Sequence, residues 1–392
     1  MAVCDSCFAP LTVDYDHDLI AGSISPTRLK GRVNSLWRYF ELLPIEGRDK
    51  VVSLDEGYTP LRKCERLGKL LGLNGLYMKD DTVNPTYSFK DRPASVGVSK
   101  AIEFGFKTVG CPSTGNLSAS TAAYSAKAGI DCYIIVPAGL EKAKLNQALA
   151  YGSRVITVKG TYDDANRLAI EAADALNIAF LNVNIRSYYT EGSKTLAFEI
   201  CEQLGWRAPD WIFVPLASGA LFCASWKGLK ELHHLDFIKD VSTRLVGVQP
   251  EGCSPIVRAF KTKGDIVPVE KPDTLVTSLA IGNPASGYQV LRMIEECDGL
   301  AEAVTDEEVI EGEKLLASSE GIYSGPASAT SIAALRKLTE AGVIEKDETV
   351  VCLITECGLK APNLPLGLSG VLYEIEPDLG SLAAVVGGER ES

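Results

Sequence analysis

The chain has 392 residues, of which 46% are hydrophobic and 23% charged, and its formal net charge at pH 7 is −12. This length predicts two domains with sizeable cores, and the acidic balance without a basic run excludes nucleic acid and anionic membrane surfaces as partners. No N-terminal hydrophobic region follows Met1 and no run approaches about eighteen apolar residues, so we expect a cytoplasmic protein that does not span a membrane.

The eleven cysteines are an odd number scattered among apolar runs, a pattern typical of reduced thiols used as small buried side chains. Cys4 and Cys7 have the spacing of half a zinc site. A closed structural zinc site needs four ligands, however, and His17 is the only other candidate nearby. We therefore expect a reduced N-terminal flap without a metal, with structural zinc as the alternative.

In chain order, the sequence predicts a short helix over residues 34–40 and an extended segment over residues 51–60. From residue 76 onward, short β-type runs alternate with longer helical stretches, which is the pattern of an α/β protein. Strands are predicted at residues 108–111, 132–136, 154–158, 179–182, 211–215, 244–248 and 349–354. Such strands indicate open, mostly parallel sheets that bind ligands beyond the carboxyl ends of their strands.

Lys90 lies where a loop gives way to a predicted helix. Asn84 and Pro85 indicate a turn, Pro93 suits only a first helical turn, and residues 94–106 carry apolar side chains at helical spacing. A lysine just before a helix N-terminus feels the positive end of the helix dipole. With partial burial this lowers its pKa and makes its amine a candidate nucleophile for Schiff-base chemistry. Taken alone, a solvated loop lysine is the commoner case.

Two loops after predicted strands contain the small and polar residues of an anion site. Residues 112–120 run into an alanine-rich helix, whose N-terminus can hold a carboxylate or a phosphate. Residues 217–221 carry one glycine and precede a second helical run over residues 222–232. Thr355 ends the last predicted strand at the same crevice. Each loop can also be read as an ordinary turn with a helix cap.

The order of these features resembles that of the fold-type II pyridoxal-phosphate enzymes, and most closely the threonine synthases. The segments that carry the resemblance are Ser88-Phe89-Lys90-Asp91-Arg92, Ser113-Thr114-Gly115-Asn116, residues 217–221 and residues 321–329. The resemblance extends from Pro10 to Lys360. It implies two open, mostly parallel twisted sheets flanked by helices, as in the tryptophan synthase β-like fold.

The resemblance also implies a domain organisation. A large cofactor-binding domain would comprise residues 51–90 and 191–365, and a small domain carrying the Asn116 loop would comprise residues 91–190. An N-terminal extension over residues 1–50 and a C-terminal tail over residues 366–392 would flank them.

For the cofactor, the resemblance implies that Lys90 carries pyridoxal 5'-phosphate as a Schiff base and that Phe89 helps to wall the ring. Thr355 would face the pyridine nitrogen, where a hydroxyl partner leaves that nitrogen largely unprotonated. Asn116 would reach the phenolic oxygen. The cofactor phosphate would be held by backbone N–H groups of the loop Ala217, Ser218, Gly219, Ala220 and Leu221.

For the substrate, the resemblance implies that a small amino acid binds through its carboxylate. That group would be held by Ser113, Thr114, Gly115, Asn116 and Leu117. Tyr87 stands beside the lysine where the family has glycine, and Arg186 is the guanidinium nearest to the expected substrate phosphate site. We therefore include both in the substrate-binding set.

Several positions depart from the threonine synthase pattern. Pro93 replaces a second glycine, and the 217–221 loop lacks two asparagines and one or two glycines, so we expect altered backbone geometry there. Arginines that the family uses for phosphate are replaced by Tyr189-Thr190 and by Ala280, which cannot bind phosphate in a bidentate manner.

Two further departures concern an acidic residue. The family pattern Glu-Pro-Ala-Ser begins here with Gly325, and Thr-Gly-His-Gly reads Thr-Glu-Cys-Gly with Glu356 in second place. We expect Glu356 to repel a phosphate dianion.

The resemblance implies a pyridoxal-phosphate-dependent carbon-oxygen lyase or transferase of amino-acid biosynthesis, threonine synthase-like, that converts O-phospho-L-homoserine and water to L-threonine and phosphate. One alternative is a paralogue that performs β-replacement or β-elimination on a serine, phosphoserine or cysteine derivative. Another is a catalytically silent regulatory relative. A homodimer is expected in each case.

Overall fold

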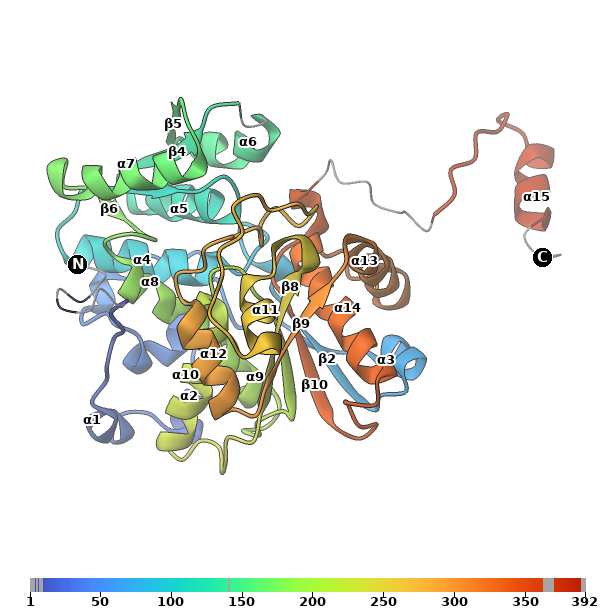
Figure 1. Cartoon of the computed structure of the whole chain (residues 1–392), viewed down its shortest axis with the longest axis horizontal. Helices are drawn as coiled ribbons and strands as arrows, with labels where there is room; N and C mark the ends of the chain where they lie inside the picture. Colours follow the sequence, from blue (N-terminus) through green and yellow to red (C-terminus); the bar gives the residue numbers. More distant parts are fainter. Residues whose placement is uncertain (1–3, 5, 7–9, 140–141, 362–369, 389–392) are drawn as a thin grey trace.

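The computed structural model describes residues 4, 6, 10–139, 142–361 and 370–388. Across these residues the larger of two sheets has the strand order β1 (Leu61–Lys63), β2 (Gly75–Asp80), β10 (Thr349–Ile354), β7 (Trp211–Pro215), β8 (Arg244–Pro250) and β9 (Leu300–Val304) (Figure 1). Strand β1 runs antiparallel to β2, whereas the other neighbouring pairs are parallel. The predicted α/β class is thus confirmed.

The smaller sheet is parallel throughout its described part, in the order β5 (Arg154–Val158), β4 (Asp131–Pro137), β3 (Thr108–Pro112) and β6 (Ala179–Phe180). It lies beside the larger sheet with its own helices, in the green and cyan part of Figure 1. Two open, mostly parallel sheets are therefore present, as predicted.

Alternation along the strands divides the core of the larger sheet into two layers. Ile212 and Val214 of β7 belong to one buried cluster, and Trp211 and Phe213 to the other. Successive side chains of a strand point to opposite faces, so a strand with helices on both sides is apolar at every position. The first face packs against α9 (Thr195–Gln203), α10 (Ala220–His234), α11 (Pro255–Thr262) and α12 (Gly287–Glu296). The second packs against α3 (Glu65–Leu71), α13 (Asp306–Glu320) and α14 (Pro326–Glu340).

The smaller sheet is covered in the same way. One cluster joins β3 and β4 to α4 (Asp91–Glu103), α5 (Asn116–Ala128), α6 (Lys142–Ala150) and α8 (Arg186–Glu191). On the other face, alanines of α7 (Tyr162–Ala175) pack against Ile135 and Phe180.

The remaining elements connect these layers or lie at the ends of the chain. The short 3-10 turns are η1 (Leu36–Leu42), η2 (Arg48–Lys50), η3 (Asp81–Val83), η4 (Gly192–Lys194), η5 (Glu251–Cys253) and η6 (Gly358–Lys360). The terminal helices are α1 (His17–Ala21), α2 (Pro26–Leu29) and α15 (Leu379–Gly388), and α15 lies away from the body (Figure 1).

Most predicted strands agree with the structure. Those over residues 154–158, 211–215 and 349–354 have the observed bounds, and the others differ by at most two residues at either end. The strands β1 and β9 were not predicted, because β1 is mostly exposed and β9 contains Glu302 between small alanines. The helix predicted over residues 34–40 is the 3-10 segment η1, so its type was wrong.

Three other predictions concern the ends of the chain and its composition. The cysteines from Cys64 onward are reduced and mostly buried, as expected, while Cys7 lies outside the described residues and leaves the zinc alternative open. Among the described residues, no helix has both the length and the apolar content needed to cross a lipid bilayer. The domain boundaries stay a prediction, and the one at residue 365 lies outside the described residues.

Candidate active site

Lys90 occupies the N-cap position of the thirteen-residue helix α4, which confirms its predicted place before a helix. The residue keeps some exposure, but its amine is surrounded by protein. Burial and, to a lesser extent, the charge of Arg186 lower the pKa of Lys90 to about 8, although Glu356 and Cys111 oppose the change. The Lys90 Nζ atom lies 4.4 Å from the centre of the Phe89 ring. An amine of this kind is a nucleophile near neutral pH.

The loop before Lys90 is held against the end of strand β10. The Phe89 N–H donates to the Thr355 carbonyl at 2.9 Å, and the Cys357 N–H donates to the Tyr87 carbonyl at 3.0 Å. Between these bonds, Ser88 forms an antiparallel bridge with Glu356. The predicted cofactor residues Lys90, Phe89 and Thr355 are therefore brought together by backbone pairing.

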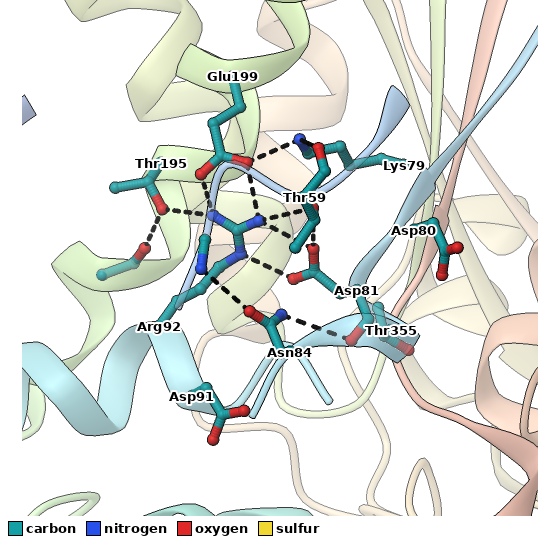
Figure 2. Close-up of polar contacts among 12 residues, drawn as sticks. Thr59, Lys79, Asp80, Asp81, Asn84, Asp91, Arg92, Thr195, Glu199 and Thr355 are labelled. Carbon is teal, nitrogen blue, oxygen red and sulfur yellow. Dashed lines mark hydrogen bonds and ion pairs between the residues drawn. The ribbon is translucent and has the colours of Figure 1, made fainter. Parts of the chain in front are cut away.

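A buried ion network fixes the start of α4 (Figure 2). The Arg92 guanidinium donates to the Asp81 carboxylate at 2.7 and 2.8 Å and also to Glu199 of α9. Glu199 in turn pairs with Lys79 of β2 at 2.6 Å. These four side chains are at most 1% exposed and carry two charges of each sign. Although burial acts to raise it, Arg92 and Lys79 hold the pKa of Glu199 at about 2. The network ties the lysine loop to the larger sheet.

The Asn116 loop lies at the N-terminus of α5, another thirteen-residue helix. Ser113, Thr114 and Asn116 are partly exposed and Gly115 is exposed, so their polar groups are accessible to a ligand. Leu117, by contrast, is 6% exposed and its side chain packs in the core of the smaller sheet. Leu117 can therefore serve a ligand only through its backbone, whose N–H belongs to the first helical turn.

The loop of residues 217–221 leads into the N-terminus of the fifteen-residue helix α10. Gly219 is its N-cap and has φ +96°, whereas Ala217, Ser218, Ala220 and Leu221 lie outside the left-handed region. The alanines and the serine therefore introduce no backbone strain, contrary to our expectation of altered geometry. A Cβ on Gly219 would lie 2.6 Å from the Val290 side chain, so this glycine cannot be replaced in the same way.

Arg186 lies beside this loop. Its guanidinium donates to the Ser286 hydroxyl at 3.3 Å, and the Ser286 N–H donates to the Ser218 carbonyl at 2.9 Å. Its charge also acts on Lys90. The structure thus brings Arg186 to the region between the lysine and the glycine loop, where an anionic ligand would be attracted.

Three further ionisable groups lie near these residues and were not in the predicted set. The Glu356 carboxylate accepts a hydrogen bond from the Asn116 amide. The Lys360 amine donates to the Thr86 carbonyl at 2.9 Å and to Gln147 at 2.6 Å. Burial, with a smaller effect of the charge of Glu356, raises the pKa of Glu313 to about 7. Glu356 had been noted only as a departure from the family pattern, and the other two carry no local signal.

These features together fit pyridoxal phosphate. The site combines a buried amine, a helix N-terminus whose glycine leaves no room for a Cβ, and a threonine at the end of a central strand. A fold of two mostly parallel sheets with this arrangement defines a class, the fold-type II pyridoxal-phosphate-dependent enzymes.

Comparisons with known proteins agree with this class. The family model described as pyridoxal-phosphate dependent enzyme matches residues 52–356. Among solved structures, maize serine racemase superposes with a TM-score of 0.66 over 85% of this chain and 92% of that chain, at 17% identity. The processed form of threonine deaminase isoform 2 from Solanum lycopersicum also has a TM-score of 0.66, over 83% of this chain and 92% of that chain, at 20% identity. These likenesses show the fold.

Sequence relatives narrow the class. The threonine synthase of Methanocaldococcus jannaschii is 44% identical over 97% of this chain and 94% of its own length. That of Methanosarcina acetivorans is 42% identical over 99% of this chain and 95% of its own length. The chain belongs to the threonine synthase family of pyridoxal-phosphate-dependent enzymes.

Proposed function

We propose that this protein converts O-phospho-L-homoserine and water to L-threonine and phosphate, with pyridoxal phosphate bound to Lys90. The observation that carries the proposal is the enclosed Lys90 amine, whose pKa is about 8. The loop that contains Lys90 is hydrogen-bonded to Thr355, the residue that follows strand β10. Family membership supports the reaction class, a carbon-oxygen lyase that depends on pyridoxal phosphate. A cytoplasmic location and a homodimer stay part of the proposal.

The bound cofactor supplies an electron sink for the bonds at the substrate α-carbon. The Lys90 amine would both hold the cofactor and move a proton at that carbon. With a pKa of about 8, about a tenth of the amine is unprotonated at pH 7, against well under a thousandth for an ordinary lysine. The enclosed position therefore makes the free base available without another catalytic base.

Other residues would bind and orient. The N-terminus of α10, with Gly219 and its neighbours, would receive the cofactor phosphate through backbone N–H groups, and Arg186 beside it adds positive charge. The N-terminus of α5, with Ser113, Thr114 and Asn116, would hold the substrate carboxylate. Tyr87, half exposed beside Lys90, would contact the substrate side chain.

A second candidate differs in substrate. Ala280 stands where the family has an arginine, and the Glu356 carboxylate adjoins the Asn116 loop, both of which weaken binding of a substrate phosphate. These observations favour β-replacement or β-elimination on a smaller amino acid as the alternative reaction.

The two candidates are separated by direct assay. The cofactor-loaded protein is incubated with O-phospho-L-homoserine, and phosphate and threonine are measured together. We expect equal amounts of both products, and neither with Lys90→Ala. If the loaded protein forms no threonine, yet its visible absorption changes when serine, phosphoserine or cysteine is added, the second candidate replaces the first.

A further inference from the structure

The carboxyl group of Glu356 is placed at the junction of three parts of the site. Glu356 follows Thr355, is 5% exposed, and is paired through its backbone with Ser88 of the lysine loop. Its side chain accepts hydrogen bonds from the Asn116 amide and from the Ala327 N–H, the latter at 3.3 Å. One buried group thus contacts both the Asn116 loop and the start of α14.

Gly325 leaves the space that this carboxyl group occupies. A Cβ built on Gly325 would lie 2.7 Å from Cγ, 2.9 Å from Oε1 and 3.0 Å from Cδ of Glu356. The two backbones are adjacent, because the Gly325 N–H donates to the Glu356 carbonyl at 2.9 Å. Gly325 is the N-cap of α14 and provides no side-chain cap of its own. Glu356 therefore caps α14 from the neighbouring strand.

Gly325 and Glu356 are two positions at which the sequence departs from the motifs of the family it resembles, and the structure places them against each other. A side chain at position 325 would collide with the Glu356 side chain from its first carbon atom onward, so the two positions compete for one small volume. The two sequence departures therefore meet at one place in the structure, where the Glu356 side chain fills the space beside Gly325.

We propose that Glu356 is a positioning residue, which holds the amide of Asn116 in the orientation that a ligand needs, and that residue 325 can carry the same carboxyl group instead. The proposal rests on the proposed function only in taking the ligand to be pyridoxal phosphate.

The chemistry of the contact explains the orientation. A carboxylate can only accept hydrogen bonds, so the atom of Asn116 that faces it must be the amide nitrogen. The second N–H of the same nitrogen and the amide oxygen are then fixed in direction and left for a ligand. Without an acceptor at this place the amide can rotate, and a ligand that needs one orientation must select it on binding.

The neighbouring charges act on this acceptor in opposite directions. The cations of Lys90 and Lys360 favour an ionised Glu356, whereas the carboxyl group of Glu313 repels it. Burial raises the pKa of Glu356, whereas the hydrogen bonds from Asn116, Ala327 and Ser278 and the charge of Lys360 oppose the rise.

The first experiment measures binding of pyridoxal phosphate alone to cofactor-free protein, so it needs no substrate. Glu356→Leu, which lacks an acceptor, should weaken binding about tenfold to a hundredfold, the range expected for loss of a hydrogen bond to a charged group. Glu356→Gln, whose oxygen can still accept from Asn116, should stay within about threefold of the parent. The matched control is Glu340→Gln, at the exposed C-terminal end of α14, the helix whose N-terminus Glu356 caps. This substitution should leave the affinity for pyridoxal phosphate unchanged.

A double-mutant cycle tests the route through Asn116. In an Asn116→Ala background, Glu356→Leu should cause almost no further loss of affinity. If Glu356→Leu weakens binding equally in both backgrounds, or if Glu356→Gln and Glu356→Leu behave alike, Glu356 does not act through Asn116 and the proposal is overturned.

The exchange itself provides the second experiment. Glu356→Gly should lose affinity as Glu356→Leu does, and adding Gly325→Glu should restore it to within about threefold. Gly325 has φ −82° and ψ 169°, which glutamate adopts without strain. The melting temperature of each cofactor-free variant shows whether it folds. A folded double variant that binds no better than Glu356→Gly contradicts the proposal. If Gly325→Glu restores the binding of pyridoxal phosphate but the parent protein forms no threonine, the proposed function is contradicted and the role of Glu356 is not.

Discussion

Replacing Arg92 by methionine would leave two buried carboxylates without their main partner. The guanidinium is fully buried and donates to Asp81, Glu199, Thr59 and Thr195 (Figure 2). Lys79 still neutralises Glu199 in the variant, so the uncompensated charge falls on Asp81. Removing one partner of a buried ion pair typically costs about 3–5 kcal/mol. We expect a destabilisation of this size, and weaker binding of the cofactor, because Arg92 anchors the helix that begins after Lys90.

The assay is urea denaturation of the cofactor-free protein, followed by tryptophan fluorescence and by far-ultraviolet circular dichroism. Arg167→Met is the matched control, since Arg167 also pairs with two carboxylates but is 66% exposed, and its loss should leave the urea midpoint nearly unchanged. Adding Asp81→Asn to Arg92→Met should recover about 1–2 kcal/mol by removing the unpaired charge. Equal effects of the Arg92 and Arg167 substitutions would refute the reasoning.

Three smaller predictions concern stability. Tyr87 has φ +65°, so Tyr87→Gly should stabilise the protein by about 0.5–1 kcal/mol in denaturant titrations, and a loss of stability would contradict this. Glu313, with a pKa raised to about 7, makes the fold less stable as pH rises from about 4.5 to 7. Glu313→Gln should therefore flatten the melting temperature across that interval, and an unchanged slope would exclude Glu313 as its source. Thr305→Ala removes the capping box of α13 and should cost about 1 kcal/mol in the same titration, unless solvent caps the helix equally well.

Local signals were sufficient for the elements around the lysine. The strand over residues 349–354 is a continuous apolar run with the observed bounds, and Pro93 and Gly219 mark the starts of helices as expected. These features depend on residues close together in sequence. A strand buried on both faces and a helix start each leave a pattern within about ten residues, which propensity and periodicity can detect.

The contacts that complete the site could not be predicted because they join distant segments. Arg92 and Glu199 are 107 residues apart, and Asn116 and Glu356 are 240 apart. Each residue taken singly reads as an ordinary surface charge or amide. Glu356 reaches Asn116 because strand β10, which precedes it, lies between β2 and β7 in the larger sheet. The contact between Glu356 and Asn116 is thus a consequence of the sheet topology.

The replaced glycines also show why a motif alone misjudges strain. In the 217–221 loop, Ala217 and Ala220 occupy backbone conformations that any residue can adopt. Alanine in place of glycine therefore adds almost no conformational strain at these two positions. Tyr87 occupies the left-handed region, where a bulky side chain costs about 1–2 kcal/mol. Its backbone is held there by Asn84 and Cys357, while its ring remains half exposed. The strained backbone of Tyr87 is not compensated by burial of its side chain. Backbone strain of this kind is typical of a functional site. This strain agrees with our proposal that the ring of Tyr87, three residues from Lys90, contacts the substrate.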